Sequence, residues 1–299
     1  MALLPFETPT SFQALLAACE TYLSSHLSDH SPQECRSMAR WLIEELSQIS
    51  AHRWALETGL EPHSPWLNAL ATALPRLASQ EPLQYILGKA YFYEHTWLVS
   101  PAVLIPRPET EQLVQTILDH PQALKGLQPR VLDVGTGSGC IALSLAAANP
   151  KALVSGVDIS DEALAVARQN QEQLHLRNAA LWQDDILSPS PNLLAQRWHT
   201  IVSNPPYIPL AEQAKMRANV REYEPHTALF VSDQNPLLFY EAISRYARQT
   251  LYEGGWLFFE IHENYAKGVV HLLQKDGFAG VEILPDLQGK ARMVLAQKP

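Results

Sequence analysis

Cysteine is scarce in this chain of 299 residues. The three cysteines, Cys19, Cys35 and Cys140, show neither close pairing nor the spacing of a zinc site, as expected in a reducing compartment. Positive charge is also in deficit, because the formal net charge is −9. That balance argues against a general attraction to nucleic acid. No apolar run approaches the roughly 18 residues that a membrane helix requires. We therefore expect no membrane segment, no bound metal and no direct nucleic-acid partner.

The first ten residues lack the basic, apolar or Arg-rich features of secretory and transit signals. A hydrophobic content of 46% and a charged content of 18% are typical of a globular protein with a sizeable core. From these features we expect a cytoplasmic protein, and we expect it to be a monomer.

Residues 1–82 carry apolar side chains at helical spacing, which predicts a small helical domain. Ser31-Pro32-Gln33-Glu34 is typical of a helix start, with Ser31 as the N-cap and Glu34 completing a capping box. Ser64-Pro65 repeats the start signal, and Pro75 is expected to end or kink the third helix. Such a domain ahead of an enzyme core is commonly a substrate-docking module or a packing cap. We assign residues 1–82 as a substrate-docking domain.

Residues 83–105 change to an aromatic and β-branched composition, with turn signals at Gly88-Lys89 and Glu94-His95. They predict a β-hairpin that joins the helical domain to the rest of the chain. The segment IPRPETE, residues 105–111, comes next, and its proline and acidic residues favour a helix N-terminus. Arg107 at this entrance belongs either to a capped surface loop or to the wall of an active site.

Residues 106–299 alternate apolar strands with helices, which include 140–148 and 266–275. The predicted strands are 130–134, 153–158, one that begins with 180–182, one that ends at 204, 256–261, 281–286 and 292–297. This alternation predicts an α/β fold with a doubly wound, mostly parallel, seven-stranded sheet. In such sheets ligands bind outside the carboxyl ends of the strands.

A glycine-rich loop, GTGSG at 135–139, follows the first of these strands. Its glycines let the backbone approach a ligand, but the spacing differs from the G-x-G-x-x-G of pyrophosphate sites. Asp133 repels phosphate and can face an ammonium group. Asp158, after the second strand, can accept from both ribose hydroxyls, and Asp185 can accept from an adenine amine. S-adenosyl-L-methionine meets all these demands, so the pattern predicts this cofactor.

The segment IVSNPPY, at 201–207, combines free acceptors with an aromatic ring. Two prolines donate no hydrogen bond, so the carbonyls before and between them are not consumed by a continuing sheet. Asn204 adds an amide and Tyr207 a flat face. A Pro-Pro pair alone is typical of a turn. Beside the predicted cofactor residues, however, this segment predicts a site that holds a planar NH2 group toward a methyl donor.

The chain resembles the PrmC family, also called HemK, in IPRPETE, VLDVGTGSG, GVDIS, IVSNPPYI and EPHTALF, over roughly residues 83–297. The resemblance implies a class I methyltransferase with a Rossmann-like fold and an NPPY motif. Its implied reaction transfers a methyl group to the side-chain amide of the glutamine in the Gly-Gly-Gln motif of peptide-chain release factors. That modification belongs to translation termination, and the implied by-product is S-adenosyl-L-homocysteine.

The resemblance also implies roles for individual residues. Cofactor binding is expected from Gly135, Thr136, Gly137, Ser138, Gly139, Asp158, Asp185, Ile186 and Asn204. Substrate binding and catalysis are expected from Asn204, Pro205, Pro206 and Tyr207. Two positions depart from the family. Ile186 stands where an aromatic residue often stacks on adenine, so aliphatic packing is expected. Pro236 stands where glycine is common, which puts the local loop shape in question.

Alternatives remain open from the residues alone. The same motif suits glutamine methylation of a ribosomal protein, or methylation of an exocyclic amine in DNA or RNA. A binding module that kept the cofactor fold without catalysis is a third option. Among further residues, Glu260 at a strand end is a candidate for a supporting role. His226 and His262 are expected to be structural or surface residues, and Cys140 a packing thiol.

Overall fold

The computed structural model describes residues 3–57, 59–61 and 64–299. By its internal contacts the chain divides into two compact units. The first unit comprises Met1–Gly88 and Arg217–Tyr223, and the second comprises Lys89–Met216 and Glu224–Pro299. A seven-residue segment from the second half of the chain therefore belongs to the helical first unit.

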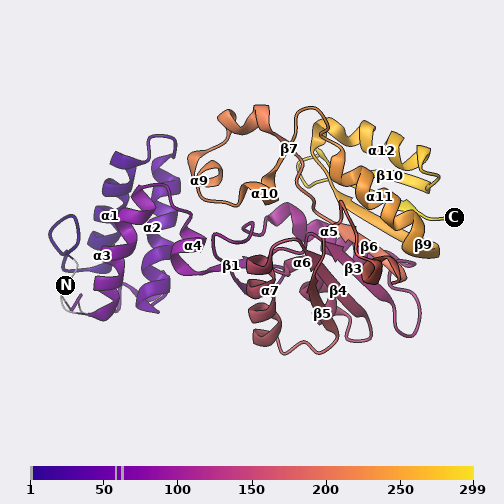
Figure 1. Ribbon diagram of the computed structural model, residues 1–299. Helices are drawn as coiled ribbons and strands as arrows, with labels where there is room; N and C mark the ends of the chain where they lie inside the picture. Colours follow the sequence, from indigo (N-terminus) through magenta and orange to yellow (C-terminus); the bar gives the residue numbers. More distant parts are fainter. Residues whose placement is uncertain (1–2, 58, 62–63) are drawn as a thin grey trace. The chain divides into compact units, whose positions relative to one another are not determined.

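The first unit is helical, with α1 (Phe12–His26), α2 (Pro32–Ser47), α3 (Pro65–Ala78), α4 (Leu83–Leu87) and α9 (Ala218–Arg221) (Figure 1). Its core is apolar and includes a stack of aromatic rings. Phe12 lies 5.4 Å from Trp54 and 5.5 Å from Trp66, measured between ring centroids. Five residues at helical spacing in α1 are buried: Phe12, Leu15, Leu16, Cys19 and Leu23.

Of two predictions that involve prolines in this unit, the structure confirms one and contradicts the other. The capping box is confirmed, because the Ser31 hydroxyl accepts from the Glu34 N–H and the Glu34 carboxylate accepts from the Ser31 N–H. An end of the third helix at Pro75 is wrong, since α3 continues to Ala78. Pro75 lies in the last turn, where its missing N–H removes only one helical hydrogen bond.

The predicted hairpin is shorter than expected. Leu83–Leu87 forms α4 instead of a strand, because Pro82 precedes the helix and Gly88 ends it in the left-handed conformation. The hairpin itself pairs β1 (Lys89–Phe92) with β2 (His95–Leu98). Its turn residues are Tyr93 and Glu94, both with positive φ, one residue before the predicted turn. Hairpin turns require such angles because they match the twist of the strands.

The second unit contains the seven-stranded sheet that the alternation predicts. Its strands are β3 (Arg130–Val134), β4 (Leu153–Asp158), β5 (Ala179–Gln183), β6 (Trp198–Ser203), β9 (Leu251–Glu260), β10 (Ala279–Pro285) and β11 (Ala291–Gln297). They lie in the order β10-β11-β9-β6-β3-β4-β5, with only β11 antiparallel to its neighbours. The strand order reverses its direction beside β3, which is where doubly wound sheets bind ligands.

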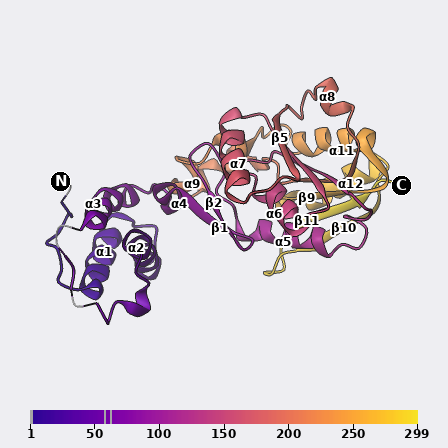
Figure 2. The ribbon, with the colours of Figure 1, turned by 90° about the horizontal axis from the view of Figure 1, so that it is seen from below.

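Helices cover both faces of this sheet, as Figure 2 shows. One core is formed with α5 (Pro108–Asp119) and α6 (Cys140–Ala148), and the other with α11 (Leu238–Thr250) and α12 (Ala266–Lys275). Neighbouring strand residues point to opposite cores: Leu257 and Phe259 to one, and Phe258 to the other. Each central strand is thus buried on both sides, which explains its nearly continuous apolar sequence.

The remaining elements are α7 (Asp161–Gln173), α8 (Pro191–Leu194), α10 (His226–Leu229), β7 (Ile208–Pro209), β8 (Phe230–Val231), η1 (Ala51–Arg53), η2 (Leu210–Lys215) and η3 (Glu263–Tyr265). Strand β9 begins at Leu251, five residues before the predicted start. Within the described parts of the chain, no helix is both long and apolar enough to cross a membrane.

Candidate active site

The carboxyl ends of β3, β4, β5 and β6 border a cavity of about 350 Å³ in the second unit. Eight of the residues predicted from the sequence line it together: Gly135, Gly137, Asp158, Asp185, Ile186, Asn204, Pro205 and Pro206. Sequence segments about 70 residues apart therefore meet at one edge of the sheet, as parallel strand ends must.

The other predicted residues lie behind this wall. Thr136 and Ser138 are buried with 4% and 2% of their surface exposed, and Gly139 is the N-cap of α6. Tyr207 is directed away from the cavity lining toward β9, where its hydroxyl donates to Glu260. These four residues shape the wall from outside the cavity.

The glycine loop presents bare backbone to the cavity. Gly135 and Gly137 have φ angles of +73° and +55°, and a Cβ at either position would meet nothing within 4 Å. The Gly135 and Thr136 N–H groups both donate to the Val157 carbonyl, which fastens the loop to β4. The positive φ explains why glycine stands there, and the open space leaves room for a ligand.

Asp133 supports this loop from beneath. Its Oδ2 accepts from the Thr136 hydroxyl at 2.7 Å and from the Ala142 N–H at 3.2 Å. The residue is fully buried, and burial raises the pKa of its carboxyl to about 7. Asp133 does not line the cavity, so its hydrogen bonds go to the loop and to α6.

Asp158 joins the loop to the next strand. One carboxylate oxygen accepts from the Gly137 N–H at 2.8 Å, and the other from the Ser160 N–H at 3.0 Å. Burial raises the pKa of this carboxyl. Each oxygen keeps a second lone pair, which can accept from hydroxyl groups of a ligand in the cavity.

Asp184, Asp185 and Ile186 line the cavity after β5. Asp185 Oδ1 accepts from the Leu187 N–H, and Asp184 accepts from the backbone and hydroxyl of Ser190. The described residues that line the cavity include three aspartates and no lysine or arginine. Such a lining suits a ligand with positive charge and without phosphate.

The NPPY segment is held by side chains from distant parts of the second unit. The Asn204 amide nitrogen donates to the Thr110 hydroxyl at 3.3 Å, and that hydroxyl donates to Glu260 Oε2 at 2.6 Å. The Tyr207 hydroxyl donates to Glu260 Oε1 at 3.2 Å. One buried carboxylate therefore connects both ends of NPPY.

Burial dominates the electrostatics of this group. It raises the pKa of the Glu260 carboxyl, against the lowering effect of hydrogen bonds from Thr110 and Tyr207. Burial and the nearby Glu260 also raise the pKa of Tyr207, so its phenol remains a donor.

Arg107 of IPRPETE forms an ion pair with Glu224, the first residue of EPHTALF. Glu224 also accepts from the Ile105 N–H at 3.1 Å and is 3% exposed. The pair fastens the start of the EPHTALF segment, whose Pro225, Thr227, Ala228 and Phe230 line the cavity. Arg107 thus supports the wall of the site.

The sequence patterns did not single out several residues of this site. They are Thr110, Glu224, Asp184, Phe230 and Phe239. Three of them, Thr110, Glu224 and Phe230, lie within quoted motifs, but only the tertiary contacts reveal their partners. Burial raises the pKa of the Cys140 thiol to about 12, so this thiol is not activated. His262 lies 3.4 Å from the carboxylate of Glu212 and edge-on to the Tyr207 ring.

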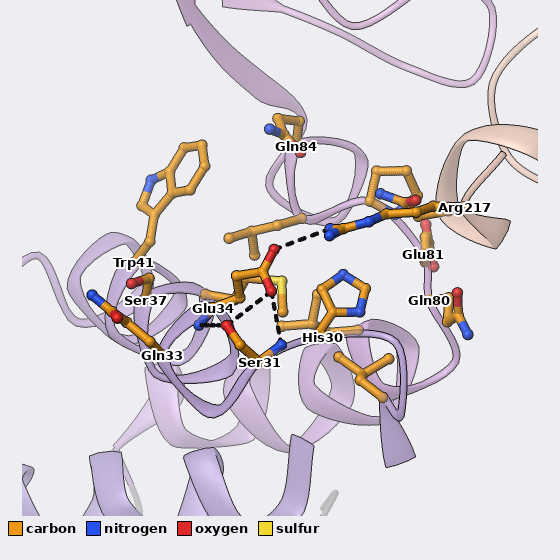
Figure 3. A pocket seen from close by; sticks show the side chains of 16 residues that line it. His30, Ser31, Gln33, Glu34, Ser37, Trp41, Gln80, Glu81, Gln84 and Arg217 are labelled. Atoms are coloured by element: carbon orange, nitrogen blue, oxygen red, sulfur yellow. Dashed lines mark hydrogen bonds and ion pairs between the residues drawn. The ribbon is translucent and has the colours of Figure 1, made fainter. Parts of the chain in front are cut away.

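The first unit contains a separate, more open cavity of about 520 Å³ (Figure 3). Figure 3 shows Glu34 at its centre, accepting from Ser31 and from Arg217. Trp41 and several glutamines complete a lining with mixed polar and apolar character. Arg217 belongs to the returning segment, so residues 183 positions apart build this cavity. In the described parts of the chain, no group of three or more His, Cys, Asp or Glu is arranged to hold a metal.

Comparisons with known proteins place these features in a family. Residues 15–88 match the family described as PrmC N-terminal domain, and residues 109–222 match methyltransferase small domain. A solved structure titled protein-(glutamine-N5) methyltransferase (release factor-specific), from Alicyclobacillus acidocaldarius, is 30% identical. It has a TM-score of 0.40, and the match covers 68% of this chain and 100% of that one.

Two curated relatives are each named release factor glutamine methyltransferase. The one from Bacteroides thetaiotaomicron is 36% identical over 93% of this chain and 98% of its own length. The one from Flavobacterium psychrophilum is 39% identical over 88% of this chain and 91% of its own length. On this similarity over nearly the whole of both chains, the protein belongs to the release factor glutamine methyltransferase family.

Proposed function

We propose that this protein transfers a methyl group from S-adenosyl-L-methionine to the side-chain amide nitrogen of the glutamine in the Gly-Gly-Gln motif of peptide-chain release factors. The observation that carries the proposal is the position of Asn204, Pro205 and Pro206. They line one part of a cavity, and the glycine loop lines another part of it. Acceptors for an NH2 group thus share a cavity with residues suited to the methyl donor.

The cavity fits this cofactor. Gly135 and Gly137 leave space for its amino acid end, and Asp158 keeps lone pairs for the ribose hydroxyls. Asp185 and Ile186 would face the adenine, with aliphatic packing from Ile186. Thr136, Ser138 and Gly139 would contribute through the shape of the loop. The bound cofactor supplies an electrophilic methyl group on a positively charged sulfur.

Asn204 and the carbonyls around the two prolines would hold the glutamine amide. An amide nitrogen is a weak nucleophile because its lone pair is delocalised into the carbonyl. Acceptors for both N–H bonds fix its direction and favour the positive charge that develops on nitrogen. With the cofactor bound, its methyl group would pass from sulfur to this nitrogen, and the methylated amide would release a proton to water. Tyr207, held by Glu260, would support the amide-binding turn from behind.

A labelled-methyl assay tests the reaction. Purified protein, tritiated S-adenosyl-L-methionine and a release factor should give labelled release factor, and Gln→Ala in the Gly-Gly-Gln loop of the release factor should abolish the label. Persistence of label in that variant would disprove the proposal. Ribosomal subunits and tRNA or duplex DNA, used in place of the release factor, test the two alternative substrates.

We further propose that the helical first unit docks the protein substrate, that the enzyme acts as a monomer in the cytoplasm, and that nucleic acid is not its partner. The mixed cavity of Figure 3 supports docking, since it offers Trp41 together with polar groups. The three free cysteines support a reducing compartment.

A pair of exposed glutamines allows a matched test of docking. Gln33 lines this cavity on α2, whereas Gln13 on α1 does not. Gln33→Lys should raise the KM for an intact release factor about tenfold, without changing the KM of a short Gly-Gly-Gln peptide. Gln13→Lys should change neither. Equal effects of both substitutions would show that this cavity does not take part in docking the release factor.

A further inference from the structure

The two hydrogen bonds behind NPPY point the same way, from donor to acceptor: Asn204 donates to Thr110, and Thr110 donates to Glu260. Glu260 lies at the end of β9, Thr110 in the first turn of α5, and Asn204 after the end of β6. The distances are 2.6 Å from Thr110 Oγ1 to Glu260 Oε2 and 3.3 Å from Asn204 Nδ2 to Thr110 Oγ1. Thr110 and Glu260 are only 3% and 1% exposed, so bulk water does not compete for these groups.

The direction follows from counting donors. An ionised carboxylate only accepts, and a threonine hydroxyl has a single hydrogen. Thr110 must therefore donate its hydrogen to Glu260, which leaves its oxygen able only to accept. The group that faces this oxygen must be a donor, and in Asn204 the donor is the NH2 half of the amide. The amide oxygen of Asn204 is then the atom left for the cavity.

We propose that Thr110 and Glu260 are positioning residues that set the orientation of the Asn204 amide, so that its oxygen, and not its NH2, faces the substrate. The proposal rests on the proposed function, because an acceptor is what a substrate amide requires. If the amide turned over, Asn204 would present two donors to the NH2 group of the substrate. The substrate nitrogen would then lose an acceptor where positive charge develops.

In its ionised form, Glu260 removes an ambiguity that a neutral residue would allow. A glutamine at this position could accept from Thr110 and donate to Tyr207, which keeps the native direction. It could equally accept from Tyr207 and donate to Thr110, which would turn Asn204 over. Only an acceptor with no hydrogen gives a single solution, which explains why an acid stands at this buried position.

Three substitutions on helix α5 test this relay of hydrogen bonds from Asn204 through Thr110 to Glu260. Thr110→Val keeps the shape but removes the hydroxyl, and should lower kcat tenfold to a hundredfold. It should change the KM for the release factor and the Kd for S-adenosyl-L-methionine less than threefold. Thr110→Ser keeps the hydroxyl and should restore kcat to within threefold of the wild type. The matched control, Thr116→Val, removes a hydroxyl that contacts neither Asn204 nor Glu260.

A kcat for Thr110→Val within threefold of the wild type would overturn the proposal, and so would an equal loss in Thr110→Ser. Cofactor binding to each variant, measured by calorimetry, shows that the site is folded. A wild-type enzyme that fails to methylate any glutamine would instead reject the proposed function.

A measurement on the free protein distinguishes failure of the relay from failure of the proposed function. In the ¹⁵N-labelled free protein, the relay protects the Asn204 side-chain NH2 hydrogens from exchange with water. Protection should be equal in the wild type and Thr110→Ser, and at least tenfold lower in Thr110→Val. Glu260→Gln should give intermediate protection or two sets of Asn204 signals. Unchanged protection in Thr110→Val would disprove the relay whatever the substrate is.

Discussion

The two walls of the cavity are built differently. On the cofactor side, hydrogen bonds connect residues that are close in the sequence: Asp133 with Thr136, three positions apart, and Gly137 with Asp158, 21 positions apart. On the substrate side, Asn204 and Thr110 are 94 positions apart, and Thr110 and Glu260 are 150 apart. The cofactor wall is thus a local structure, whereas the substrate wall depends on the whole second unit.

This difference has a functional consequence. Changes in the cofactor wall should act mainly on cofactor affinity or local stability, because that wall holds itself together. Changes in the substrate wall should act on turnover, because the orientation of one amide depends on distant side chains. The predictions below test that separation.

The largest effect is expected for Asn204→Ala. Loss of one acceptor for the substrate amide should lower kcat about 10²- to 10³-fold. The Kd for S-adenosyl-L-methionine should change less than about threefold, since the glycine loop and Asp158 remain. Single-turnover kinetics and calorimetry measure the two quantities. Unchanged turnover would remove Asn204 from catalysis, and a parallel loss of cofactor binding would contradict the separation of the two walls.

The next largest effect is expected for Arg107→Met. This change leaves Glu224, whose side chain is 1% exposed, without its ion-pair partner. Breaking a buried ion pair costs about 3–5 kcal/mol. Because Arg107 is partly exposed, we expect the substitution to lower the free energy of unfolding by about 2 kcal/mol. Urea denaturation measures the loss. The double variant with Glu224→Gln should recover at least half of it, and no recovery would show that the two residues act independently.

An intermediate effect is expected from pH at Asp133. Its pKa of about 7 in the folded protein lies above the usual 3.8, so the folded state holds the proton more tightly than the unfolded state. The resulting stability is present below pH 3.8 and is lost as pH rises through about 7. Asp133→Asn should cancel a loss of about 2 kcal/mol between pH 5.5 and 8. Urea denaturation at pH 5.5 and 8 compares the two proteins, and equal pH dependence would contradict the prediction.

The smallest effect is expected for Gly135→Ala. A side chain at φ +73° strains the backbone by about 1–2 kcal/mol, and its methyl group enters the cavity. The Kd for S-adenosyl-L-methionine should rise about tenfold, with kcat at saturating cofactor nearly unchanged. Gly289→Ala is the matched control, since φ there is +82° with equally open space, away from the cavity. Equal cofactor affinity in both variants would show that the loop backbone does not face the ligand.

Much of the second unit could be predicted from the sequence. Strands β3 and β4 and helices α6 and α12 have the predicted bounds, because apolar periodicity and capping are local signals. Helix α4 was predicted as a strand, since four of its five residues are aromatic or aliphatic and suit either state without their tertiary neighbours. Pro75 was given too much weight, because its effect depends on how close it lies to the helix end.

The sequence alone determined the elements whose information lies within a few residues. These are the positive-φ glycines, the carboxylates that follow strands, and the prolines of NPPY without donors. Only the tertiary structure decided that Thr110 lies between Asn204 and Glu260, and that Arg107 pairs with Glu224. The physical reason is the sheet order: pairing of β6 with β9 brings the strand ends at Asn204 and Glu260 together, and no local pattern encodes that pairing.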